Sequence, residues 1–225
     1  MPGPVWNDDA TRDAALLVRN SAQLVGDLSA SATSRALPKL GEVLGWHSTI
    51  YTGCSVPVPG YIGHLRGDES VPELVGYEVG VGPAQADGLP EKVGVWSATV
   101  ADQVRQLLRS IHAAVLQLDA ALPAKVRPTT VAEIDAVIQL TAIVHGEWLR
   151  IHPFANGNGR TARAWTSWLA LRYSLPLFVT VKPRPVDTAY VAAGKASMGR
   201  PPDFVGDHTV ATRVFAHMLA LSLLP

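Results

Sequence analysis

Hydrophobic residues recur every three or four positions along most of the chain, a spacing that predicts amphipathic helices. We predict helices over residues 10–30, 36–53, 99–122, 129–151, 158–175, 186–198 and 208–224. A small polar run at residues 29–34 is predicted to separate the first two, and Pro38 is placed in the first turn of the second. The fold class expected from this pattern is mostly α.

The helices are expected to bury their apolar faces in one core. The face of the first helix consists of Ala14, Leu17, Val18, Ser21, Leu24, Val25 and Leu28, and that of residues 129–151 of Ile134, Val137, Ile138, Thr141, His145 and Trp148. Thr130 followed by Glu133 is a capping-box pattern that marks the start of the second of these helices. On this pattern His145 is expected to be a core histidine, and Trp148, Trp165 and Trp168 are expected to pack in the core.

Residues 53–97 follow a different pattern. A Gly- and Pro-rich stretch is followed by two short β-like runs, residues 73–82 and 92–100, with a loose connection between them. Two such runs predict one β-hairpin, which is the only β signal in the chain.

Composition narrows the functional classes. A length of 225 residues suits one domain with an additional element. Because 19 basic and 19 acidic residues balance without a block of like charge, binding to nucleic acid or to a membrane surface is not expected. The single cysteine excludes an internal disulfide, and the N-terminus lacks the pattern of a signal peptide. We therefore expect a cytoplasmic protein.

The stretch IHPFANGNGRTAR, residues 151–163, joins two predicted helices and carries the candidate chemistry. Pro153 cannot continue the first helix, and the second helix begins near Asn158 with backbone N–H groups that lack intrahelical partners. Gly157 and Gly159 allow the backbone to wrap closely around a ligand, which predicts a nest of N–H groups for phosphate.

Charged and titratable side chains flank this nest. Arg160 and Arg163 are three residues apart, so they lie on one side of the helix start, where two guanidinium groups suit phosphate oxygens. His152 has the pKa range of a general base near neutral pH. A base, a phosphate cradle and two arginines within so short a stretch favour a nucleotide site over a packing motif.

The stretch closely resembles the Fic-domain motif, in which His-Pro-Phe is followed, one residue later, by an acidic residue and then by Gly-Asn-Gly-Arg or Gly-Asn-Lys-Arg. The resemblance covers about residues 46–220, leaving residues 1–45 as an N-terminal helical segment and residues 46–225 as the Fic domain. It implies a mostly α-helical bundle in which the hairpin is the flap that docks the target protein, about Gly76 to Trp96. It also implies an adenylyltransferase that moves AMP from ATP to a Ser, Thr or Tyr hydroxyl.

The resemblance implies a role for each residue of the motif. His152 would be the general base, and Phe154 would anchor the loop. Gly157, Asn158 and Gly159 would form the phosphate nest. Arg160 would hold the β-phosphate and act in catalysis, and Arg163 would hold the γ-phosphate.

Two positions depart from the family pattern. Asn156 stands where the family usually has Asp or Glu to hold Mg²⁺ or Mn²⁺, so the metal site is expected to be weaker. Residues 21–26 have the frame of the family's inhibitory motif, but Val25 replaces its Glu. Self-inhibition through that Glu is therefore not expected, and either a relic or a chance match explains the frame.

Several alternatives stay open. Relatives transfer UMP, phosphocholine or phosphate, although Gly159 in place of Lys argues against the phosphate-transferring branch. Two further alternatives for the function are a nucleotide-binding module with little catalysis and a toxin that a separate inhibitor protein holds inactive. The chain is either monomeric or a homo-oligomer. A metal site at His145, Glu147 and His152 is not expected, because the residues lack the H-E-x-x-H order. Arg184 and Tyr190 either border the nucleotide or have surface or packing roles.

Overall fold

The computed structural model describes residues 3–6, 13–81 and 91–224, and over these residues it is mostly helical. The α-helices are α1 (Ala14–Ser34), α2 (Leu40–Ile50), α3 (Ser97–Ala121), α4 (Val131–Ile151), α5 (Asn158–Arg172), α6 (Thr188–Met198) and α7 (Thr209–Ser222). Short 3-10 helices cover Pro59–Tyr61 and Pro72–Leu74. The predicted fold class, mostly α with one small hairpin, is confirmed.

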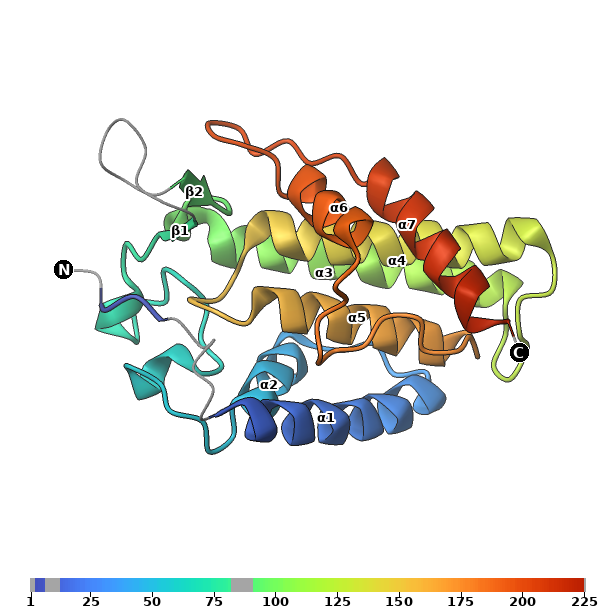
Figure 1. The fold of residues 1–225 in the computed structure, drawn as a ribbon, viewed down its shortest axis with the longest axis horizontal. Helices are drawn as coiled ribbons and strands as arrows, with labels where there is room; N and C mark the ends of the chain where they lie inside the picture. Colours follow the sequence, from blue (N-terminus) through green and yellow to red (C-terminus); the bar gives the residue numbers. More distant parts are fainter. Residues whose placement is uncertain (1–2, 7–12, 82–90, 225) are drawn as a thin grey trace.

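The helix α5 runs through the middle of the molecule (Figure 1). It packs against α1 and α2 on one side and against α4 on the other, while α3, α6 and α7 pack on α4. Trp148, Trp165 and Trp168 are fully buried, and the rings of Trp148 on α4 and Trp165 on α5 lie 6.1 Å apart. The predicted tryptophan core is therefore confirmed.

The first helix ends later than the sequence pattern predicts, because α1 continues through residues 29–34 to Ser34. The hydroxyls of Thr33 and Ser34 donate to the carbonyls of Ser29 and Ser31, so these polar residues are satisfied within the helix. Ala32 is buried and extends the apolar face. The helix ends at Arg35, whose left-handed backbone donates to the carbonyl of Ala32.

Two other boundaries differ from prediction. Pro38 lies outside α2, because Lys39 is the N-cap and its N–H donates to the Glu42 carboxylate at 2.7 Å. Residues 97–100 belong to α3 and not to a strand, since the helix begins at Ser97. The capping box at Thr130 and Glu133 is confirmed as the start of α4.

The predicted hairpin is confirmed. Its strands are β1 (Val79–Val81) and β2 (Glu91–Val93), antiparallel, with Val79 opposite Val93 and Val81 opposite Glu91. The connection between them, residues 82–90, lies outside the described residues.

The N-terminal segment does not stand apart from the rest of the chain. The helix α1 packs along α5, and the predicted boundary after residue 45 falls inside α2. The division into a segment of residues 1–45 and a domain of residues 46–225 stays a prediction. Among the described residues, none of the helices combines the length and hydropathy that a bilayer crossing requires.

Candidate functional site

His152 is the C-cap of α4, and its backbone is left-handed with φ 55°. Its N–H still donates to the carbonyl of Trp148, and Pro153 then turns the chain away from the helix. The ring Nδ1 lies 3.2 Å from the carbonyl oxygen of Leu149. Because a carbonyl only accepts, Nδ1 carries the proton, and the lone pair of Nε2 is left to accept a proton from a hydroxyl.

The surroundings of His152 favour the neutral imidazole. Burial, together with the positive charges of Arg66 and Lys92, lowers the pKa of His152 from 6.5 to about 4, although the Leu149 carbonyl opposes this. At neutral pH the ring is therefore unprotonated, which is the state that a general base requires.

Hydrogen bonds and packing of its own residues fix the conformation of the loop after His152. The side chain of Asn158 accepts from the N–H of Phe154 and donates to the carbonyl of the same residue, both at 2.8 Å. Phe154 is fully buried and its ring stacks on His47, with centroids 3.9 Å apart. The predicted anchor role of Phe154 fits this burial, whereas the Asn158 side chain holds the loop and leaves only its backbone for a ligand.

Gly157 is the N-cap of α5, with φ 82°. Its carbonyl accepts from the N–H groups of Arg160 and Thr161. A Cβ at this position would lie 2.7 Å from the ring of Tyr51 and 3.0 Å from His47. Both the backbone conformation and the close packing therefore require glycine.

The two motif arginines are nearly buried, with exposed fractions of 7% for Arg160 and 5% for Arg163. Arg160 donates to the hydroxyl of Tyr51 at 2.7 Å, and Arg163 donates from Nε to the carbonyl of Val181 at 2.9 Å. Burial lowers the pKa of Arg163; Tyr190 opposes this, while Arg160 and Arg184 add to the lowering. Like charges that disfavour one another are stabilised by an anion, so this group suits phosphate.

Asn156 already has partners for both atoms of its amide. Its Nδ2 donates to the carbonyl of Trp6 at 2.8 Å, and its Oδ1 accepts from the N–H of Gly157 at 2.5 Å. In the described part of the chain, no group of three or more His, Cys, Asp or Glu side chains could hold a metal ion. The residues as they lie do not provide a metal site of their own, and the role of Asn156 as a metal ligand stays a prediction.

The base of the hairpin lies against the motif. A Cβ at Gly94, the residue after β2, would come 2.3 Å from the Cβ of His152 and 2.9 Å from Arg66. The hairpin is thus placed where a segment paired with it would lie near the imidazole. Docking of a target on Gly76 to Trp96 stays a prediction.

Sequence reasoning missed the residues that support the motif from a distance, among them His47 and Arg66. The His47 ring accepts from the N–H of Gly63 at Nδ1 and donates from Nε2 to the carbonyl of Asn156, both at 3.0 Å. Arg66 donates to the carbonyl of His152 at 2.7 Å. His47 lies on a predicted helix and Arg66 in a Gly-rich loop, and neither position carries a periodic or motif signal.

The other polar residues considered from the sequence, His145, Glu147 and Tyr190, have partners of their own. His145 is buried and shares a hydrogen bond of 3.0 Å with the Tyr190 hydroxyl, as expected for a core histidine. The carboxylate of Glu147 is bound by Arg150 and His208. Tyr190 contacts Arg163 as well as His145, so it borders the arginine group while packing in the core.

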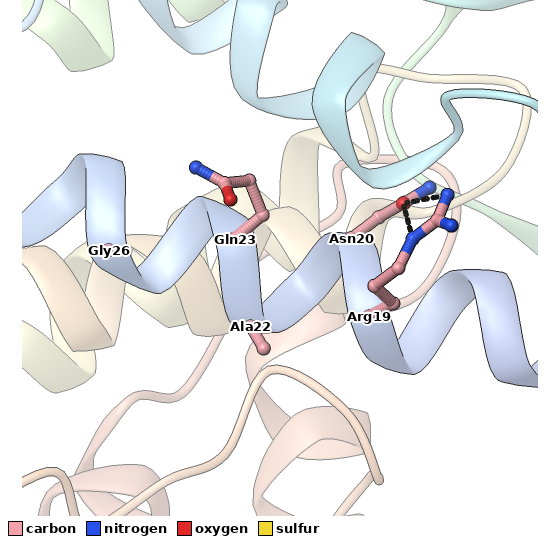
Figure 2. Close-up of a pocket in the computed structure, with 5 residues that line it drawn as sticks. All are labelled: Arg19, Asn20, Ala22, Gln23 and Gly26. Carbon is pink, nitrogen blue, oxygen red and sulfur yellow. Dashed lines mark hydrogen bonds between the residues drawn. The ribbon is translucent and has the colours of Figure 1, made fainter.

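A hollow of about 570 Å³ lies on α1 and contains none of residues 151–163 (Figure 2). It is lined by Arg19, Asn20, Ala22, Gln23 and Gly26. Asn20 donates from this position to the carbonyls of Ile50 and Thr52, so its side chain fixes the end of α2.

Comparison with known proteins agrees with the motif. The model of the Fic/DOC family matches residues 84–170. A Fic domain containing signalling protein from Bacteroides thetaiotaomicron has a similar fold, with a TM-score of 0.59 at 15% identity over 92% of this chain and 70% of that one. The BepC protein of Bartonella tribocorum, a VirB-translocated effector solved with bound AMPPNP, gives a TM-score of 0.49 at 14% identity over 95% of this chain and 90% of that one.

None of the curated proteins matches the chain. The family match includes the whole motif of residues 151–163, and the structural neighbour shares the helical fold around it. Residues 84–170, which carry the motif, therefore match the Fic/DOC family.

Proposed function

We propose that this protein transfers AMP from ATP to a hydroxyl of a target protein. Transfer of a phosphate-linked group is the chemistry typical of the family, and the choice of AMP rests on the motif. The observation that carries the proposal is a neutral His152, with Nε2 available, in the same loop that begins α5 and its arginines.

The reaction follows from these groups. Nε2 of His152 takes the proton of the target hydroxyl while the hydroxyl oxygen attacks the α-phosphorus of ATP. The bond from the α-phosphorus to the bridging oxygen breaks, and pyrophosphate leaves. Arg160 and Arg163, with backbone N–H groups at the start of α5, stabilise the negative charge on the phosphates.

The test is a transfer assay with two labels. Purified protein and its His152→Ala variant are incubated with a host lysate and ATP labelled at either the α- or the γ-phosphate. We expect protein bands labelled from the α-position only, and a loss of about 10²–10⁴-fold in the variant, the usual contribution of a general base. Equal melting temperatures of the two proteins would show that the variant is folded.

The other outcomes point to the alternatives. Label from the γ-position would mean phosphate transfer and would contradict AMP transfer. Nucleotide binding by calorimetry without any transfer would favour a binding module, for which the engaged amide of Asn156 is the structural reason.

A further inference from the structure

Arg66 lies in the loop between α2 and β1, far in sequence from the motif, and its side chain is fully buried. A buried guanidinium is costly unless its donors are satisfied, because burial removes its hydration. All five of its N–H groups can be accounted for by five acceptors: the carbonyls of Tyr77, Val95, Ile151 and His152 and the carboxylate of Glu78.

One set of these contacts holds the catalytic turn. Nε of Arg66 donates to the carbonyl of His152 at 2.7 Å and Nη2 to that of Ile151 at 3.1 Å, while the backbone N–H of Arg66 donates to the carbonyl of Pro153 at 2.8 Å. These three successive carbonyls lie where α4 ends and helical partners are lacking. Arg66 thereby fixes the left-handed backbone of His152, a conformation that costs energy in a residue other than glycine.

The other contacts hold both ends of the hairpin. Nη1 donates to the carbonyl of Tyr77 at 3.2 Å and to Glu78 at 2.9 Å, and Nη2 donates to the carbonyl of Val95 at 2.9 Å. Tyr77 precedes β1 and Val95 follows β2. Glu78 in turn accepts from the N–H and hydroxyl of Ser97 and from Lys92, so it joins the hairpin to the start of α3.

We propose that Arg66 is a positioning residue that sets the hairpin in register with His152, so that a segment paired with the hairpin presents its hydroxyl to Nε2. This inference rests on the proposed function. A residue that only stabilised the fold would need to bind either the turn at residues 151–153 or the ends of the hairpin. The guanidinium of Arg66 binds both through the same planar group. Lysine cannot replace it, because an ammonium has three N–H donors and no fixed fork.

The experiment compares Arg66→Lys with Arg172→Lys. Arg172 is also a buried arginine, but it binds Asp119 and the carbonyls of Arg35 and Ala36 at the far end of α5. We expect Arg66→Lys to lower kcat for target modification on the order of 10²-fold with an unchanged Kd for ATP, the scale of a displacement of about 1 Å. Arg172→Lys should lower stability without this selective loss.

Two readouts do not depend on transfer. In Arg66→Lys, the ring Cε1–H resonance of His152 should shift and the amides of Tyr77 and Val95 should exchange faster with solvent, whereas Arg172→Lys should change neither. If wild-type protein transfers nothing but these changes occur, the proposed function fails while the coupling stands.

Three results would overturn the coupling: unchanged resonance and exchange, equal losses in both variants, or a loss of ATP affinity that accounts for the loss of activity. If Arg66→Lys does not fold, Glu78→Gln takes its place, because it removes the charge that binds Arg66 and Lys92. It should produce a smaller change in the same direction, and no change in exchange or kcat would count against the coupling.

Discussion

His152 has a strained, left-handed backbone, and its imidazole ring is held in one tautomer. Two cationic side chains, Arg66 and Lys92, face it from the loop before the hairpin and from β2, and Leu149 holds its Nδ1 proton. The low pKa keeps the ring unprotonated but makes it a weak base until phosphate charge arrives. Bound ATP should therefore raise the pKa of His152 and increase its basicity.

The pH dependence of transfer tests this protonation state. Because burial and nearby cations lower the pKa of His152 to about 4, kcat/KM should stay constant down to about pH 5 and fall below it. The measurement is a pH–rate profile at low ATP. Lys92→Met removes one cation, so its acid limb should move to higher pH. A wild-type limb near pH 6.5 would contradict the assignment.

Asn156 offers a second test at the scale of one side chain. Asn156→Asp keeps an acceptor for the N–H of Gly157 but loses the donor to the Trp6 carbonyl. We expect the free energy of unfolding to fall by about 1–3 kcal/mol, since Trp6 then has a carboxylate facing its carbonyl. Chemical denaturation measures the loss, and Asn156→Gln serves as the control that keeps the amide. Equal stability of wild type and Asn156→Asp would show that this contact contributes nothing.

At the scale of the element, α5 supplies both the proposed phosphate site and the centre of the core. Its first two turns carry Arg160 and Arg163, and its later turns bury Trp165 and Trp168 against neighbouring helices. The helix is therefore held on nearly all sides, so its N-terminal groups are fixed before a ligand arrives.

Arg163 is expected to act on the terminal phosphate. Arg163→Gln should weaken ATP binding about 10–100-fold, the worth of a charge-assisted hydrogen bond, and leave AMP binding nearly unchanged. Calorimetry with the two nucleotides makes the comparison. Parallel losses for ATP and AMP would mean that the variant disturbs the whole pocket rather than the γ-phosphate contact.

The start of α4 gives a prediction independent of catalysis. Thr130 is the N-cap and its hydroxyl accepts from the N–H of Glu133 at 3.2 Å. Thr130→Ala should lower the free energy of unfolding by about 1 kcal/mol without changing nucleotide affinity. Urea denaturation gives the value, and Thr130→Ser, which keeps the hydroxyl, should retain most of the stability. An equal loss in both would assign the effect to packing.

At the scale of the whole molecule, α4 joins the turn at His152 to α6 and α7 through buried side chains. His145 on α4 bonds to the hydroxyl of Tyr190 on α6 and packs against Phe215 on α7, with ring centroids 5.0 Å apart. Tyr190 also contacts Arg163 on α5, so it connects Arg163 to the contacts among α4, α6 and α7.

Stability should depend on pH through His145. Burial, and the charges of Arg163 and His208, lower its folded pKa from 6.5 to about 3, so the unfolded chain binds the proton more readily. The stabilisation is complete above pH 6.5 and declines as the pH falls toward about 3. Denaturation at about pH 7.5 and about pH 5 should show a smaller difference for His145→Gln than for wild type. An equal change in the free energy of unfolding between the two pH values for wild type and variant would contradict the prediction.

Local signals predicted much of this molecule. The periodicity located all the α-helices of the described residues, although it ended α1 too early and placed Pro38 inside α2. The hairpin and the Fic/DOC assignment were predicted as well. The polar run at residues 29–34 misled because its hydroxyls are satisfied inside the helix and Ala32 continues the buried face.

The helical pattern, the hairpin and the motif of residues 151–163 can be predicted from the amino-acid sequence alone, because each depends on neighbours a few positions apart. The distant groups that hold the motif become known only from the folded chain: Trp6 on Asn156, His47 against Phe154, and Arg66 between the hairpin and His152. Periodicity reports which side chains are buried, whereas the partner of a buried polar group is fixed by how separate elements pack.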